Sequence, residues 1–152
     1  MVNALIDRGA DVNAPTTNPE HEKTTPLIVA SANGRVEVMR VLLAAGARVH
    51  LGNADGCTAL MYASFHGQVE AIRVLLAAGA QINHVDANGW TALMCASQVG
   101  QVQAVKVLLA AGADPRITSP DGATALGAAQ RYKHPAIVSL LQAKLAELAG
   151  SA

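Results

Sequence analysis

Aromatic and charged side chains are scarce in this chain of 152 residues. Aromatic residues make up 3% of the sequence, and charged residues 14%, well below the roughly 25% that is usual in soluble domains. The formal net charge is zero, so the chain lacks the excess of Lys and Arg with which proteins hold nucleic-acid phosphates. We therefore expect no nucleic-acid partner. Because Ala, Val and Leu supply most of the 51% hydrophobic content, the core is predicted to consist of packed aliphatic helices.

Cysteine is almost absent, and long apolar runs are missing. Cys57 and Cys95 are too few and too far apart to indicate a disulfide framework or a metal site, so we expect reduced thiols in a reducing compartment. No apolar run approaches the roughly 20 residues that span a bilayer, and MVNALIDRGADVN does not have the pattern of a secretory leader. The sequence predicts no membrane association. A cytoplasmic location is expected, and a nuclear one is also compatible.

The sequence repeats the same pattern of residues at a step of 33. A Thr-x-Leu triplet begins at four positions along the chain, and a glycine follows nine residues after the first three of them. Pairs of leucines recur at the same step. The repeated letters are Thr25, Thr58, Thr91 and Thr124, then Gly34, Gly67 and Gly100, and the pairs Leu42-Leu43, Leu75-Leu76 and Leu108-Leu109.

One period encodes two short helices and a turn. Thr58 is a good N-cap, and residues 59–66 fit a helix that ends at Gly67, where a left-handed conformation is allowed. A second helix is predicted by apolar residues at spacings of three and four, namely Val69, Ile72, Leu75 and Leu76. A polar connection with a tight turn at Asn88-Gly89 follows that second helix. One such unit cannot bury its own apolar stripe, so neighbouring units must stack.

The repeated segments resemble ankyrin repeats. The resemblance rests on TPLIVASANG, TALMYASFHG and TALMCASQVG, and on LLAAGARVH, LLAAGAQIN and LLAAGADPR. It implies an all-α solenoid of antiparallel helix pairs with projecting β-turn or hairpin loops. We expect a single domain over residues 1–152, divided into a half repeat at 1–14, an insertion at 15–19 and repeats at 20–52, 53–85, 86–118 and 119–152.

The sequence departs from the family's pattern at several positions. The frequent His of the first helix is replaced by Ile28, Met61, Met94 and Gly127, so apolar packing is expected to substitute for its hydrogen bonds. Lys133 and Leu145 replace glycines, and the last helix is predicted to continue through Leu148. The half repeat lacks its first helix. It is either part of a longer array, which we favour, or a simple cap.

No pattern of catalytic or metal-ligating residues is present. The histidines show neither H-E-x-x-H nor a Cys-x-x-Cys companion, and no glycine-rich phosphate-binding motif occurs. We expect no enzyme activity, no metal and no cofactor. Cys57 lies on a turn and is expected to be reactive only if exposed, whereas Cys95 is interpreted as a small core residue.

The resemblance instead implies a non-enzymatic protein-interaction module that acts as a scaffold, adaptor or inhibitor, as a monomer or within a longer ankyrin array. The alternative is a regulatory domain that masks an enzyme in a longer polypeptide. Ankyrin proteins contact their partners through the concave face formed by the turns and the ends of the first helices. Phe65, Trp90 and Tyr132 fall there, unless they fold against neighbouring units. Carried over by position, the predicted protein-binding residues are Asn33, Asp55, Phe65, His66, Val85, Asn88, Trp90, Gln98, Val99, Arg131 and Tyr132.

Overall fold

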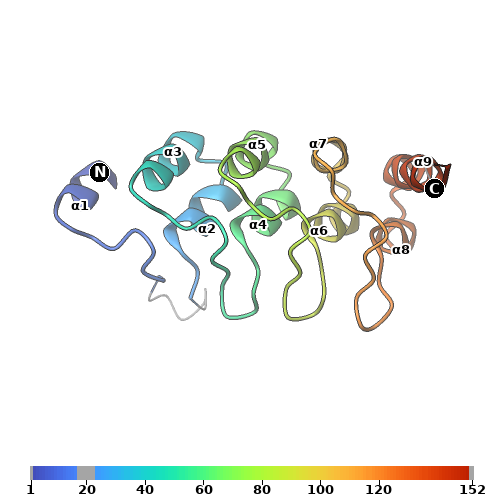
Figure 1. Ribbon diagram of the computed structural model, residues 1–152, viewed down its shortest axis with the longest axis horizontal. Coiled ribbons are helices and arrows are strands. Elements are labelled where there is room, and N and C mark those ends of the chain that lie inside the picture. The colour runs from blue at the N-terminus through green and yellow to red at the C-terminus, as the bar shows by residue number, and fades with distance from the viewer. Residues whose placement is uncertain (1, 17–22, 151–152) are drawn as a thin grey trace.

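The computed structural model describes residues 2–16 and 23–150, and the regular secondary structure within these ranges is helical (Figure 1). The only β pairing among the described residues is an isolated bridge between Gly52 and Thr58. The helices are α1 (Val2–Asp7), α2 (Pro26–Ala32), α3 (Val36–Ala44), α4 (Ala59–Phe65), α5 (Val69–Ala77), α6 (Ala92–Val99), α7 (Val102–Ala110), α8 (Ala125–Arg131) and α9 (Pro135–Gly150).

The helices form two layers, and long turns project from one side (Figure 1). The first helices α2, α4, α6 and α8 stand side by side, and each packs against the next in the row. The second helices α3, α5, α7 and α9 form the other layer, with α1 beside α3. We call the projecting turns at residues 53–57, 86–90 and 119–123 the fingers. The predicted all-α solenoid of helix pairs is confirmed. The predicted insertion at 15–19 lies partly outside the described residues.

Threonine begins each first helix, as the sequence predicts. The Thr25, Thr91 and Thr124 side chains accept a hydrogen bond from the backbone N–H three residues later, which satisfies one free donor of the first turn. Thr58 stands at the same N-cap position, but its side chain makes no such bond. Each helix is therefore started by the same residue type, although only three of the four use its hydroxyl as a cap.

The core consists of aliphatic side chains that run through the whole stack. Leu27, Leu60 and Leu93 of the first helices are at most 2% exposed, and Ile72 and Leu108 of the second helices are fully buried. Burial of each such side chain contributes about 1.5–3 kcal/mol relative to exposure. Ile28, Met61 and Met94, which stand where the family often has His, are also buried, so the predicted apolar substitution is confirmed at these three positions. Gly127, at the fourth position, is exposed and does not contribute such packing.

Glycine ends the first helices for two physical reasons. Gly34, Gly67 and Gly100 have φ values of 65°, 67° and 80°, which a side chain disfavours. A Cβ atom at each would also collide with a side chain of the following unit, and these side chains are Gln68, Gln101 and His134.

Lys133 takes the place of glycine in the last unit and has a φ of 61°. Within the described chain no further unit stacks behind Lys133, so a side chain at this position does not collide with a following unit. The cost of Lys133 is therefore the strain of its left-handed backbone. The final helix α9 continues for 16 residues, from Pro135 to Gly150, as the sequence predicts.

We expect Lys133→Gly to raise the free energy of unfolding by about 1 kcal/mol, because glycine removes the penalty of a left-handed backbone. The matched control is Lys106→Gly within α7, which should lower stability by about 1 kcal/mol through loss of helix propensity. Urea unfolding followed by circular dichroism measures both changes. A loss of stability in Lys133→Gly would contradict this account of the last turn.

Candidate functional site

The fingers are held by hydrogen bonds from a polar side chain at the start of each turn. Asn53, Asp86 and Ser119 occupy this position, one per finger. Each side-chain oxygen accepts bonds from backbone N–H groups further along its own turn, which fixes the turn without help from a partner. The bonds are Asp55 N and Cys57 N to Asn53 Oδ1 (3.0 and 2.9 Å), Asn88 N and Trp90 N to Asp86 Oδ1 (2.8 and 2.9 Å), and Ala123 N to Ser119 Oγ (2.9 Å).

Neighbouring fingers are also joined to one another. The Ala87 backbone N–H donates to the Asp55 carbonyl oxygen over 2.8 Å. His84 Nε2 lies 3.0 Å from the carbonyl oxygen of Gly56, to which it can donate. The first two fingers therefore form one preorganised surface. We use the term finger face for the fingers, Val85 directly before the second finger, and the C-terminal ends of α4, α6 and α8 with the cap residue that follows each helix.

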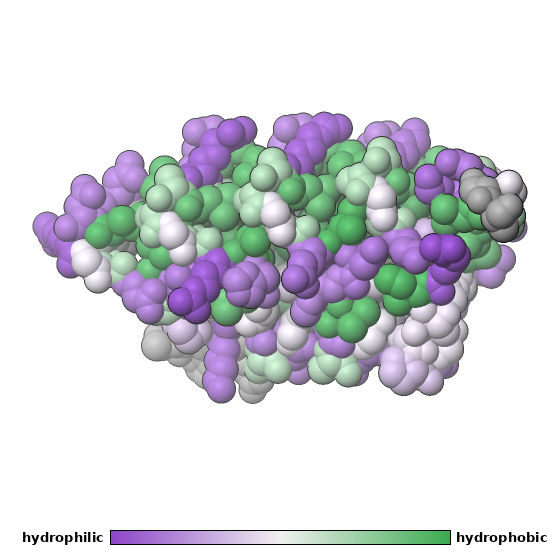
Figure 2. Space-filling model, in the orientation of Figure 1, coloured by the Kyte–Doolittle hydropathy of each residue, from purple (hydrophilic) through white to green (hydrophobic). Residues whose placement is uncertain are grey.

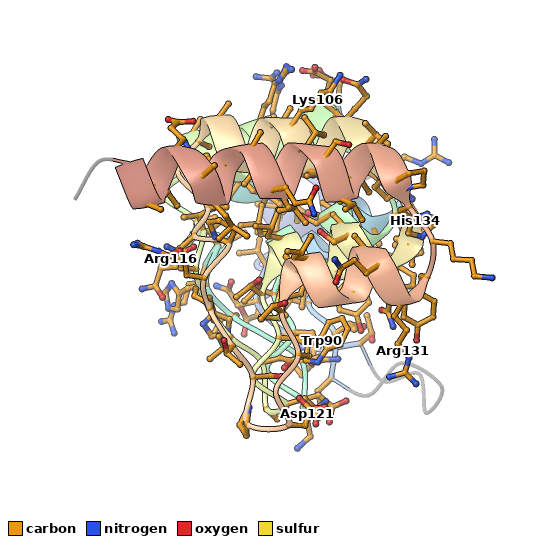
Figure 3. The ribbon with its side chains drawn as sticks, turned by 90° about the vertical axis from the view of Figure 1, so that its right-hand side faces the viewer. Trp90, Lys106, Arg116, Asp121, Arg131 and His134 are labelled. Atoms are coloured by element: carbon orange, nitrogen blue, oxygen red, sulfur yellow. The ribbon has the colours of Figure 1, made fainter. Side chains whose placement is uncertain are left out.

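A cleft of about 580 Å³ opens on the finger face between the second and third fingers. It brings together Phe65 from the end of α4, Trp90 from the second finger and Gln98 from α6. The remaining wall consists of Asp86, Ala87, Asn88, Cys95, Pro120 and Asp121. Viewed from the end of the stack, Trp90, Asp121 and Arg131 lie toward the fingers, whereas Lys106 lies beyond the second-helix layer (Figure 3).

Large apolar side chains are exposed on this face. Phe65 is 41% exposed, Val85 44% and Tyr132 47%. Trp90 differs from them, because it is half-buried and packs against the hydrophobic core. The indole therefore both packs against the core and forms part of the wall of the cleft.

Polar and ring contacts extend the cleft toward the last unit. Gln98 Nε2 donates to the Tyr132 hydroxyl over 3.3 Å. The Arg131 guanidinium carbon lies 6.0 Å from the centre of the Tyr132 ring, and the Phe65 and His66 rings make an edge contact at 5.2 Å. These contacts orient the exposed rings without burying them.

The other predicted residues are not all gathered in the cleft. Asn33 caps the end of α2, donates to the Val29 carbonyl oxygen over 2.8 Å and borders a different hollow. Asp55 is exposed in the first finger, and Val99 is half-buried at the end of α6.

Asp86 was missed as a lining residue by sequence reasoning, and Cys95 was interpreted only as a core residue. The signal for Asp86 was its periodic match with Asn53 and Ser119.

The two cysteines have weakly acidic thiols. Burial, followed by the nearby Asp86 carboxylate, raises the pKa of Cys57 to about 11, and Cys57 Sγ donates to Asp86 Oδ2 over 3.6 Å. Burial is also the main cause that raises the pKa of Cys95, to about 12. Both cysteines are unpaired and carry little thiolate near neutral pH. Neither thiol suits nucleophilic catalysis.

The described residues offer no metal site and no membrane span. Nowhere within residues 2–16 and 23–150 do three His, Cys, Asp or Glu side chains converge as metal ligands would. His50 and His84 border one small hollow, but His84 is directed to a backbone carbonyl. None of the helices in the described part of the chain has the length and hydropathy needed to cross a bilayer.

Comparison with known families supports the repeat architecture. The family model described as "Ankyrin repeats (3 copies)" matches residues 1–86 and 78–149. No curated protein matches the sequence.

We expect Cys57 in the folded chain to react with iodoacetamide at pH 8 roughly a hundredfold more slowly than in the urea-unfolded chain, because its pKa rises from 9.0 to about 11. Asp86→Asn keeps the side-chain oxygen that holds the finger but removes the charge. It should accelerate the reaction only in part, since burial is the larger cause. Peptide mapping by mass spectrometry separates Cys57 from Cys95. A folded Asp86→Asn chain that reacts as fast as the unfolded one would contradict the role given to burial.

Proposed function

Since this chain belongs to the ankyrin-repeat family, whose repeats are generally protein–protein interaction modules, we propose that its finger face binds a partner protein. Phe65 and Tyr132 serve as exposed anchors in this proposal, and Trp90 forms a wall of the cleft that Phe65 also lines. The chain acts as a non-enzymatic scaffold, adaptor or inhibitor.

The observation that carries the proposal is the distribution of exposed apolar side chains. The exposed large hydrophobic residues among those described are Val29, Phe65, Val85 and Tyr132, and all but Val29 lie on the finger face. Each of these four residues exposes more than two fifths of its surface to water. Aromatic and Arg side chains beside a cleft are the residue types that dominate protein-binding hot spots. Arg131, next to Tyr132, adds such a cation.

The rigidity of the fingers supports the same function. Their turns are closed by internal hydrogen bonds, and the first two are bonded to each other. A partner therefore does not have to order them, and the entropy lost on binding is correspondingly small. Because the net charge of the chain is zero, apolar contacts and complementary shape are expected to contribute more to the affinity for the partner than long-range electrostatic attraction does.

The chemistry of the face favours binding over catalysis. The thiols of Cys57 and Cys95 have raised pKa values, and the Asp86 carboxylate is occupied by backbone N–H groups of its own finger. A catalytic site needs a nucleophile and a base in contact with each other and free to reach a substrate. The cleft supplies apolar rings and engaged polar groups instead.

We expect Phe65→Ala combined with Tyr132→Ala to reduce partner affinity by at least about thirtyfold, the effect of losing about 2 kcal/mol at a binding hot spot. The partner is first identified by mass spectrometry of proteins cross-linked through a photoreactive residue at position 65 or 132, in extract of the native host. Its affinity for each purified chain is then measured by calorimetry.

The control variant combines Arg40→Ala with Arg73→Ala, which alters exposed side chains of the second-helix layer. It should leave the affinity unchanged. Circular dichroism checks that both variants keep their helices. Equal affinity of the aromatic variant and the native chain would refute the assignment of the finger face.

A further inference from the structure

The fingers are negatively charged, although the formal net charge of the chain is zero. Each finger carries one aspartate, namely Asp55, Asp86 and Asp121, and none of the three contains Lys or Arg. The only Lys or Arg on the finger face is Arg131, at the end of α8. Lys106 in α7 lies on the opposite side of the molecule (Figure 3). The surface proposed for partner binding therefore has a local excess of negative charge.

Two of these carboxylates line the cleft together with two aromatic rings. Asp86 comes from the second finger and Asp121 from the third, and the cleft of about 580 Å³ lies between these fingers. Phe65 and Trp90 also line it, whereas none of the described residues of its wall is Lys or Arg. A ring face and a carboxylate both attract positive charge, so this combination of side chains suits a cationic group.

The charge of Asp86 is not needed to hold its finger. Asn53 and Ser119 hold the other two fingers with a neutral side-chain oxygen, and Asp86 uses only Oδ1 for the same task. The second oxygen, Oδ2, accepts from the Cys57 thiol over 3.6 Å, and a thiol is a weak donor. Asp86 thus places beside the cleft a negative charge that the turn itself does not use.

An exchange of side chains next to Asp86 provides the space. Asp86 and Cys95 stand 33 residues after Asn53 and Tyr62. In the earlier unit Asn53 Nδ2 donates to the Tyr62 hydroxyl over 3.1 Å, so a neutral amide and a phenol ring fill this place. In the later unit a carboxylate replaces the amide and a small thiol replaces the ring, and both line the cleft. Room for a side chain is thus left beside a negative group.

Asp121 is ionised at neutral pH. The Ser119 hydroxyl donates a hydrogen bond to it and lowers the pKa of this carboxyl from its usual value. Its side chain is exposed in the third finger, so a partner can reach it without displacing another part of the described chain. The cleft therefore offers a negative group from each of its two fingers.

On the basis of the function proposed for the finger face, we propose that the cleft binds an arginine side chain of the partner protein, with its guanidinium against the rings of Phe65 and Trp90 and paired with Asp86 and Asp121. A planar guanidinium stacks on aromatic faces and forms forked hydrogen bonds with carboxylates. The ammonium group of lysine is more strongly hydrated and lacks the planar fork, so arginine fits this cleft better.

The probe is the tripeptide Gly-Arg-Gly, acetylated and amidated at its ends, and its control contains citrulline, which has nearly the shape of arginine but no charge. Trp90 is the only tryptophan of the chain, so its fluorescence reports on the cleft directly. The arginine peptide should change this fluorescence in a saturable manner, followed to about 10 mM peptide at low salt because a single side chain binds weakly. The citrulline peptide should bind at least about tenfold more weakly. Sodium chloride should weaken binding of the arginine peptide alone.

Matched variants of the chain locate the contact. Asp86→Asn keeps the oxygen that holds the finger, as Asn53 does in the first finger, and Asp121→Asn alters an exposed side chain, so both are expected to fold. Each should weaken binding of the arginine peptide about threefold, through loss of one partly exposed charge pair. Glu70→Gln makes the same change of net charge on the second-helix layer and should leave the affinity unchanged. Phe65→Leu keeps an apolar side chain without the ring and should weaken binding about threefold. Circular dichroism verifies the fold of each variant.

Four results would overturn the proposal. Equal binding of the arginine and citrulline peptides would show that the cleft does not recognise charge. Equal binding of a Gly-Lys-Gly peptide would remove the preference for a guanidinium. Unchanged affinity of the arginine peptide for the double variant Asp86→Asn, Asp121→Asn would place the peptide elsewhere. A dimer of the chain alone in light scattering that Asp121→Asn dissociates would assign the cleft to a second copy.

Failure of the arginine site and failure of the finger face are told apart by the readout. The peptide titrations test the arginine site alone, through Trp90 fluorescence. The finger face itself is refuted when the variant Phe65→Ala, Tyr132→Ala keeps the native affinity for the cross-linked partner. In a partner that binds as proposed, the segment cross-linked at position 65 contains an arginine whose replacement by citrulline lowers the affinity.

Discussion

The burial of each first helix by its neighbours is the interaction on which the rest of this structure depends. A helix of seven or eight residues has little stability by itself in water. Leu60 in α4 and Leu93 in α6 are nevertheless almost completely buried, because α2, α4, α6 and α8 stack in one row. The second helices close the row from one side. Stability is therefore distributed along the stack as contacts between adjacent units.

Close stacking accounts for the residues that the repeat keeps small. Ser64 and Ser97 are fully buried and satisfy their hydroxyls at the carbonyl four residues earlier, so they add no unpaired polar atom to the interface. Gly67 and Gly100 leave room for Gln101 and His134 of the following unit, whose side chains donate back across the interface. Each glycine thus lets its helix end in a left-handed turn and leaves space for the side chain that bonds the next unit to this helix. Lys133 replaces glycine in the last unit, where no such link is required within the described chain.

The surfaces that no neighbouring unit covers differ in chemistry between the two sides of the molecule. The second-helix layer exposes a band of aliphatic residues below a hydrophilic ridge (Figure 2). Charged pairs such as Glu37 with Arg40 and Glu70 with Arg73 lie on that layer and are exposed. The finger face instead carries Phe65 and Tyr132 beside a cleft.

The sequence alone determined the architecture. A step of 33 residues repeats Thr at the start of every first helix and Gly at the end of all but the last. Such a pattern predicts helices and turns, because the spacing of residue types along the chain reflects local structure. It also predicted which positions are free to vary, and Phe65 and Tyr132 among them are exposed.

Only the tertiary structure decided which of those positions share a cleft, because that depends on the spacing between units. It separated Asn33 from Trp90, added Asp86 and Cys95 to the cleft wall, and placed Trp90 partly in the core. It also raised the pKa of Cys57, since burial and an aspartate 29 residues away act through space and leave no local signal in the chain.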